Sequence, residues 1–152
     1  MRRIVGCLVL GVICGVLGFS QSTSRSGGVP AGIRFSEFYA AGGSRGLVFS
    51  EKLRELNNNS VVMSGFMAPP LKPALDFFVL TSRPLSICPF CDTDASWPAD
   101  IVVVYLRDGE TTVATINPLQ VTGRLELGSY TDEITGFVSQ IRIYADRIEQ
   151  IR

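Results

Sequence analysis

The sequence predicts a mainly β domain, a small OB-like barrel of five or six strands with one short helix, preceded by a signal-peptide helix. Apolar residues make up 46% of the chain, short β-rich runs recur between turn residues, and one stretch alone has sustained helical periodicity. A barrel removes the exposed edges of so small a sheet. A ferredoxin-like fold would need two amphipathic helices, and the sequence offers one. We expect a signal peptide at 1–20, a flexible linker at 21–34 and the barrel at 35–152.

The first twenty residues have the anatomy of an export signal. Arg2 and Arg3 precede the uncharged apolar run 4–19, and a polar stretch follows. This run is shorter than the roughly 20 residues of a membrane-spanning helix, and its glycines weaken it as an anchor. We therefore expect cleavage after Ser20 and export to the periplasm or the extracellular space. An uncleaved leader would be the domain's only attachment to the membrane, with its N-terminus in the cytoplasm.

Composition argues against two classes of function. Once Arg2 and Arg3 leave with the leader, 12 basic residues remain against 14 acidic ones, a net charge of −2. Nucleic-acid binding needs a clustered excess of Lys and Arg, so no nucleic-acid partner is expected. The chain has no histidine, the commonest general base and the commonest metal ligand. A Ser-His-Asp or Cys-His mechanism is therefore excluded, and we expect a non-enzymatic protein without a cofactor.

The first predicted element of the domain is its one short helix, which begins after Ser50. Serine is a preferred N-cap residue, and Glu51 follows it in the first turn. Phe49, Leu53 and Leu56 share one face of this helix. We expect that face to plug one side of the barrel.

The remaining elements are predicted to be strands. They cover residues 61–67, 77–81, 101–106, 119–127 and 134–145, with 112–116 extending the hairpin that follows the third strand. The run 101–106 is continuously apolar, as is typical of a strand buried on both faces. The run 119–127 alternates apolar and polar residues, as in a half-buried strand. Gly65 and Gly136 are expected to mark strand bends, and Met63 to fill the core together with Met67.

Cys88 and Cys91 form a Cys-Pro-Phe-Cys motif, the one paired-thiol motif of the mature chain. Outside the cytoplasm they can join as a disulfide, which would shape a loop, because closing so short a loop stabilises by only about 2 kcal/mol. A redox role would need a thiolate at the start of a helix, and Pro98 leaves no room for a long one. A metal site would need further ligands from Asp92, Asp94 or a second copy of the chain.

The other residues with chemical potential have structural interpretations. Asp100, Asp132 and Glu133 have no spacing that compels a shared site, so we expect them to cap turns. Trp97, beside Pro98, is expected to cover an end of the barrel.

Five segments carry a resemblance to known proteins: residues 62–70, 77–80, 88–91, 100–104 and 121–128. Over 61–143 the chain resembles a family of small exported bacterial proteins of uncharacterised activity, which share a strand ending in Gly-Phe-Met, a cysteine-containing loop and a late Val-x-Gly-x-Leu-x-x-Gly strand. The resemblance implies export and an OB-like barrel. Some relatives accompany membrane transport systems, which implies an accessory role in the envelope. It brings no catalytic residue onto this chain.

Together these points predict an exported, non-enzymatic binding or accessory module of the cell envelope. Its expected partner is an envelope protein or a membrane transport complex. The alternative is a thiol-redox or metal-binding protein that uses Cys88 and Cys91, because those two thiols are the only paired ones left after export.

Overall fold

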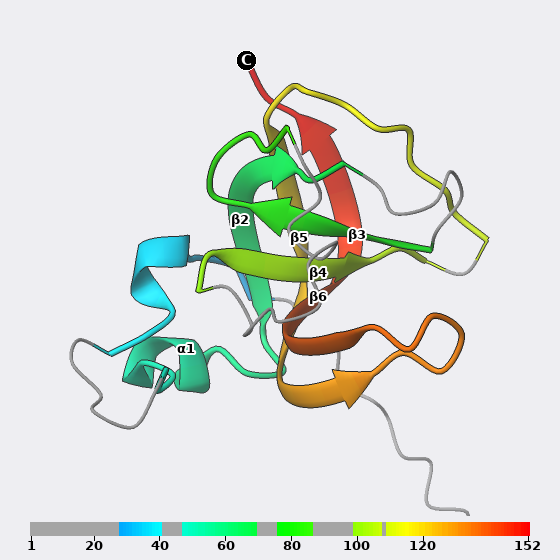
Figure 1. The fold of residues 1–152 in the computed structure, drawn as a ribbon. Helices are drawn as coiled ribbons and strands as arrows, with labels where there is room; N and C mark the ends of the chain where they lie inside the picture. The colour runs from blue at the N-terminus through cyan, green and yellow to red at the C-terminus, as the bar shows by residue number, and fades with distance from the viewer. Residues whose placement is uncertain (1–27, 41–46, 70–75, 87–98, 108) are drawn as a thin grey trace, which may run out of the picture.

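A computed structural model of the chain describes residues 28–40, 47–69, 76–86, 99–107 and 109–152 (Figure 1). The predictions for the leader, for Cys88 and Cys91, and for Trp97 concern residues outside this described part. The structure therefore tests none of those predictions.

The described residues form six strands, one α-helix and one 3-10 helix. The strands are β1 (Ala31–Gly32), β2 (Ser60–Met67), β3 (Phe77–Thr81), β4 (Ile101–Tyr105), β5 (Leu119–Thr131) and β6 (Val138–Gln150); the helices are η1 (Phe35–Glu37) and α1 (Glu51–Glu55). All six strands belong to one sheet. The predicted mainly β class with one short α-helix is confirmed.

The sheet closes on itself as a small barrel (Figure 1). β2 pairs antiparallel with both β3 and β5, β3 pairs antiparallel with β4, and β5 pairs antiparallel with β6. The ring is completed by a parallel pairing of β4 with β6. The order β2-β3-β4-β6-β5 and back to β2 is that of an OB barrel, as predicted. β1 is a short parallel addition to β2.

The core fills the inside of this barrel with alternate residues of each strand. Its fully buried members include Val61, Leu80, Val102, Val104, Val121, Leu125, Ile141 and Ile143. β4 is buried on both faces, as its continuous apolar run predicted, and β3 is buried on both faces too. β5 alternates between buried and partly exposed residues as far as Leu125, which confirms the predicted pattern. Met63 and Met67 both lie in the core, as expected.

Helix α1 plugs one side of the barrel, as the sequence predicted. The Ser50 hydroxyl caps it by accepting a hydrogen bond from the Leu53 amide at 3.1 Å. Leu53 is fully buried in the barrel core. After the helix, the Asn58 amide donates to the Leu125 carbonyl of β5 at 2.8 Å, which fixes the segment against the sheet. No helix among the described residues is long and apolar enough to cross a membrane.

The predicted strand at 112–116 is wrong. These residues lie between β4 and β5 and form no strand. The reason is non-local: β4 pairs with β3 along one edge and with β6 along the other, so neither edge remains for a hairpin partner.

The connection between β5 and β6 also differs from the prediction. Gly136 bends no strand but lies in the turn, with a φ of 71° that glycine adopts without steric cost. The predicted strand 119–127 is longer in the structure, because β5 continues to Thr131 through an irregularity in register between Leu127 and Tyr130. β6 consequently starts at Val138 and ends at Gln150, later than predicted.

Candidate functional site

The candidate site arises because two neighbouring strands differ in length. β4 pairs with β6 only over residues 103–105 and 142–144, and β4 then ends at Tyr105. β6 continues to Gln150 with β5 along one edge. Its other edge therefore faces the 109–118 loop, where no strand lies.

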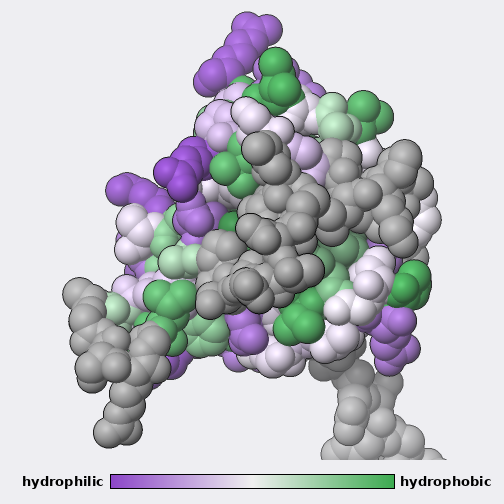
Figure 2. Space-filling model, in the orientation of Figure 1, coloured by the Kyte–Doolittle hydropathy of each residue, from purple (hydrophilic) through white to green (hydrophobic). Residues whose placement is uncertain are grey.

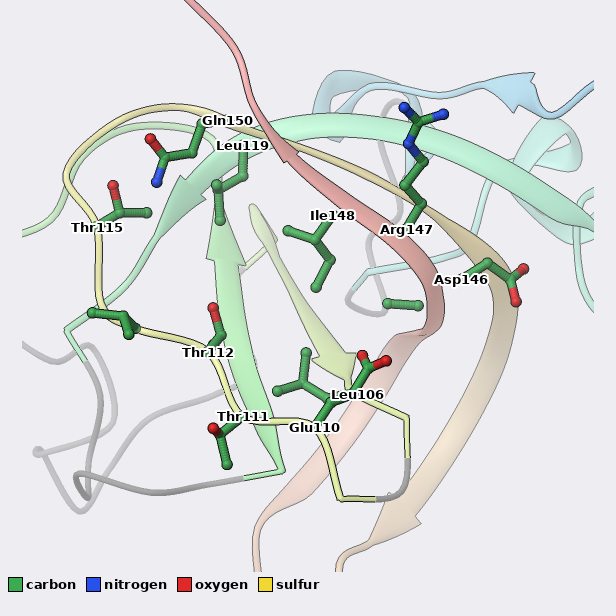
Figure 3. A pocket seen from close by; sticks show the side chains of 12 residues that line it. Leu106, Glu110, Thr111, Thr112, Thr115, Leu119, Asp146, Arg147, Ile148 and Gln150 are labelled. Carbon is green, nitrogen blue, oxygen red and sulfur yellow. The ribbon is translucent and has the colours of Figure 1, made fainter.

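A pocket of about 390 Å³ lies between this edge and the 109–118 loop (Figure 3). Its volume is within the range of ligand pockets. The loop contributes Glu110, Thr111, Thr112, Val113 and Thr115, β6 contributes Ala145, Asp146, Arg147, Ile148 and Gln150, and Leu106 and Leu119 complete the lining. Figure 3 shows Thr111 and Thr112 along the loop, Thr115 beside Gln150, and Ile148 on the strand that faces the loop. We call this pocket the β6 groove.

The strand edge in the β6 groove presents backbone hydrogen-bonding groups. The Ile151 amide donates to the Pro118 carbonyl at 2.9 Å, which sets the alternation of bonded pairs between β5 and β6. In an antiparallel ladder every second residue directs its N–H and C=O away from the partner strand. At this end of β6 those residues are Ile148 and Gln150. Among the described residues, no backbone hydrogen bond joins them to the loop.

The rim of the β6 groove carries charges of both signs, two arginines and three carboxylates. An Arg107 Nη atom lies 3.9 Å from the Asp146 carboxylate and another lies 4.0 Å from that of Glu110. Arg147 pairs with Glu149 at 2.8 Å. All five side chains are well exposed, so these pairs contribute little stability. The rim thus gives no strong preference for an anion or a cation.

A second candidate surface is the outer face of β3 and β4, the second and third strands of the barrel, which OB barrels commonly use for ligands, together with the neighbouring β6. Phe77, Tyr105 and Tyr144 form a row across these strands, with ring centroids 5.4 and 5.5 Å apart. The Arg124 guanidinium continues the row 4.5 Å from the centre of the Tyr144 ring. The faces of Tyr144 are therefore occupied by its own neighbours, and Phe77 and Tyr105 are buried. This row is better explained as packing than as a platform for a stacked ligand.

Asp132, one of the carboxylates named in the sequence, caps a turn, as expected. The Asp132 carboxylate accepts hydrogen bonds from the Thr135 amide at 2.8 Å and the Thr135 hydroxyl at 2.7 Å. The Tyr105 hydroxyl is 3.4 Å from Asp132. Burial raises the pKa of Asp132, but these hydrogen bonds outweigh it and hold that pKa below its ordinary value. Asp100 accepts a hydrogen bond from the Ser82 hydroxyl at 2.8 Å, in the turn before β4.

A buried arginine ties the outer face together. The Arg142 side chain is almost fully buried and donates to Glu126 at 3.0 Å and to the Gly128 carbonyl at 2.7 Å. Arg124 donates to the second oxygen of Glu126 at 2.8 Å. Burial raises the pKa of Glu126, but hydrogen bonds from the two arginines outweigh it and leave the pKa below its ordinary value. This network supports the fold beside the bulge of β5 and leaves no charge free for chemistry.

The structure does not bring the acids named in the sequence together. Asp100 and Asp132 serve different turns, and the described residues hold no cluster of three acidic, cysteine or histidine side chains that could ligate a metal. The β6 groove was missed at the sequence level. The run 111–116, rich in β-forming residues, suggested a strand there and gave no signal of a pocket.

Comparison with known proteins supports the fold. No family model and no curated protein matches the chain. Its fold is similar to the crystal structure of a DUF3299 family protein from Pseudomonas aeruginosa, with a TM-score of 0.52 and 15% sequence identity. The match covers 82% of this chain and 98% of that one. At this identity the likeness concerns the fold alone, a small β-barrel with one short α-helix.

Proposed function

We propose that the chain is an exported, non-enzymatic binding module of the cell envelope that holds its partner in the β6 groove. The observation that carries the proposal is a pocket of about 390 Å³, one wall of which is a strand edge that no other described strand pairs with. Sites of this volume and concave shape are the usual places where proteins bind ligands. The charged leader followed by an uncharged run supports export.

Composition supports binding over catalysis. The chain has no histidine, and the side chains that line the groove offer no nucleophile paired with a base. The thiol-redox or metal-binding alternative remains a prediction from the sequence, because Cys88 and Cys91 lie outside the described residues.

Site-specific photo-cross-linking in the encoding organism tests the proposal. The full-length chain, with its leader, carries the photoreactive residue at Thr112 in the groove or, as a control, at Glu55 on the exposed side of α1. We expect the chain outside the cytoplasm with its N-terminus just after Ser20, and one cross-linked partner from Thr112 alone. A chain that stays in the cytoplasm with its leader intact, or equal cross-linking from both positions, would contradict the proposal.

A further inference from the structure

We propose that the occupant of the β6 groove is an extended polypeptide segment of the partner, which adds a strand to the free edge of β6. This inference rests on the proposed function and specifies the chemistry of its partner. An extended peptide is the ligand whose own N–H and C=O groups repeat with the spacing of a strand edge.

The first support is the hydrogen-bonding capacity of the edge. Ile148 and Gln150 each direct one donor and one acceptor into the groove, and no described backbone group bonds them. Two residues apart along a strand, they repeat at about 6.6 Å, which matches alternate residues of a second strand. Unpaired edges of this kind are templates for strand addition.

The second support is the space beside the edge. The incoming strand would lie along the same edge of β6 that β4 occupies at residues 142–144. β4 ends at Tyr105, so this edge has no strand beside it further along β6. Neighbouring strands need about 4.8 Å between their axes. The loop reaches β6 through Asn117, whose side chain donates to that of Gln150 at 3.2 Å, whereas Thr111 and Thr112 lie across the pocket from Ile148 (Figure 3). The groove can therefore take an added strand without displacing one of the barrel's own strands.

The third support is the character of the groove walls, which fits a strand of alternating residues. Leu119 and Ile148 are apolar and pack with the barrel core, so they can receive the side chains on one face of the peptide. Thr111, Thr112 and Thr115 offer small polar surfaces to the other face. On the side of the molecule in Figure 2, the visible described residues mix hydrophobic and hydrophilic side chains without one dominant patch.

Charge distinguishes a peptide from a nucleic acid or another polyanion. Glu110 and Asp146 line the groove, and the exposed Arg107 lies near both of them. The negative phosphates of a nucleic acid would lie near these carboxylates and the backbone carbonyls of β6, and both would repel them. Arg147 also lines the groove but pairs with Glu149, so the rim has a net charge of only about −1 and suits a segment with little net charge.

A random linear peptide library displayed on phage provides the probe, with the secreted protein as the target. Selected peptides are then synthesised with single N-methyl groups at successive positions, because each N-methyl group removes one backbone donor. Strand addition predicts loss of binding at every second position and tolerance at the positions between. Amide exchange at Ile148 and Gln150 should be fast in the free protein and slow in the complex.

The substitution Gln150→Pro tests the hydrogen bonds that the strand edge of the protein donates. The N–H of Gln150 faces the groove, so proline at this position removes a donor to the peptide while the hydrogen bonds between β6 and β5 remain. Gln150→Ala is the matched control, since it also loses the hydrogen bond from Asn117 but keeps the amide. We expect peptide affinity to fall about tenfold in Gln150→Pro relative to Gln150→Ala, with unchanged circular dichroism.

Four results would overturn strand addition: no selected peptide, N-methyl effects without alternation, equal affinities of the two Gln150 variants, or amides already protected in the free protein. Protection that grows with protein concentration would assign the edge to a second copy of the chain instead. If cross-linking from Thr112 persists while these tests fail, the binding module stands and its partner is held by side chains. If that cross-link is absent, the proposed function itself fails.

Discussion

Gly65 is a position where one added methyl group should disturb the barrel, because two strands approach each other closely there. It lies where β2 leaves its pairing with β5, which includes Gly65 and Leu119, and begins to pair with β3 at Phe66. A Cβ atom at Gly65 would lie 2.6 Å from the Thr81 carbonyl oxygen and 2.9 Å from the Leu80 Cγ atom. Both distances are shorter than real Cβ contacts, so β2 and β3 would have to separate.

The expected cost of Gly65→Ala is about 2 kcal/mol. Bringing the closest contact to 3.0 Å requires a movement of about 0.4 Å against a backbone carbonyl. Overpacking of this kind costs roughly 1–3 kcal/mol, and the lower entropy of the unfolded alanine chain returns only part of that. With a urea dependence of about 2 kcal/mol per M, the unfolding midpoint should fall by about 1 M.

Urea unfolding of purified Gly65→Ala and Gly32→Ala gives the comparison. Gly32 lies in β1, and a Cβ atom there would meet nothing within 4 Å. We expect Gly32→Ala to stay within about 0.5 kcal/mol of the parent protein. Equal midpoints for the two variants would refute the close approach of β2 and β3 at Gly65.

Three further predictions concern stability. Leu53→Ala should lower the free energy of unfolding by about 2–5 kcal/mol, because this fully buried side chain of α1 fills the barrel. Ser139→Ala should leave it unchanged or raise it by about 1 kcal/mol, because that buried hydroxyl has no described hydrogen-bond partner. Glu126 has a pKa held below its ordinary 4.5 in the folded state by Arg124 and Arg142, against the effect of burial. Its stabilising contribution is present above pH 4.5 and lost as pH falls through the lower folded pKa. The free energy of unfolding of Glu126→Gln should therefore fall less in acid than that of the parent protein.

Urea midpoints check all three, with a matched comparison for each. Glu55→Ala changes an exposed residue of the same helix and should have little effect, so a similar loss in Leu53→Ala and Glu55→Ala would argue against the plug. Ser129→Ala is the exposed counterpart of Ser139→Ala, and a clear loss confined to Ser139→Ala would mean that its hydroxyl is bonded. For Glu126→Gln, urea midpoints should be measured from neutral pH to below pH 4.5. If the midpoint of the variant falls with decreasing pH as steeply as that of the parent protein, a group other than Glu126 causes the loss of stability in acid.

The parts of the fold that depend on local sequence could be predicted. The apolar runs at 77–81 and 101–106 became strands buried on both faces, and Ser50 capped the helix as its residue type suggests. The predicted strand at 112–116 was wrong because β-propensity indicates only that residues suit a strand. A strand also needs the edge of a neighbouring strand to pair with. The edges of β4 were taken by β3 and by β6, and β6 comes 30 or more residues later in the chain.

The groove could not be predicted for a related reason. Its lining residues are of types common on any protein surface, and none has a spacing that indicates a site. The groove exists because β4 has five residues and β6 thirteen, and because their parallel pairing starts late in β4. Both are matters of register, which a single sequence specifies only through the packing of the whole barrel.

The free edge of β6 has two possible meanings, and its surroundings favour one of them. Natural proteins protect strand edges with inward-pointing charges, prolines or a covering segment. Here Arg147, which lines the groove, pairs with Glu149, and the backbone groups directed into the groove belong to Ile148, packed against the core, and the neutral Gln150. The 109–118 loop lies opposite, but its backbone makes no hydrogen bond to this edge among the described residues. Arg107 donates to the Asp146 carbonyl earlier on β6, but at Ile148 and Gln150 no described backbone group protects the edge. This part of the edge, beside a pocket of ligand size, is suited to pairing, and the Gln150 variants separate pairing from passive exposure.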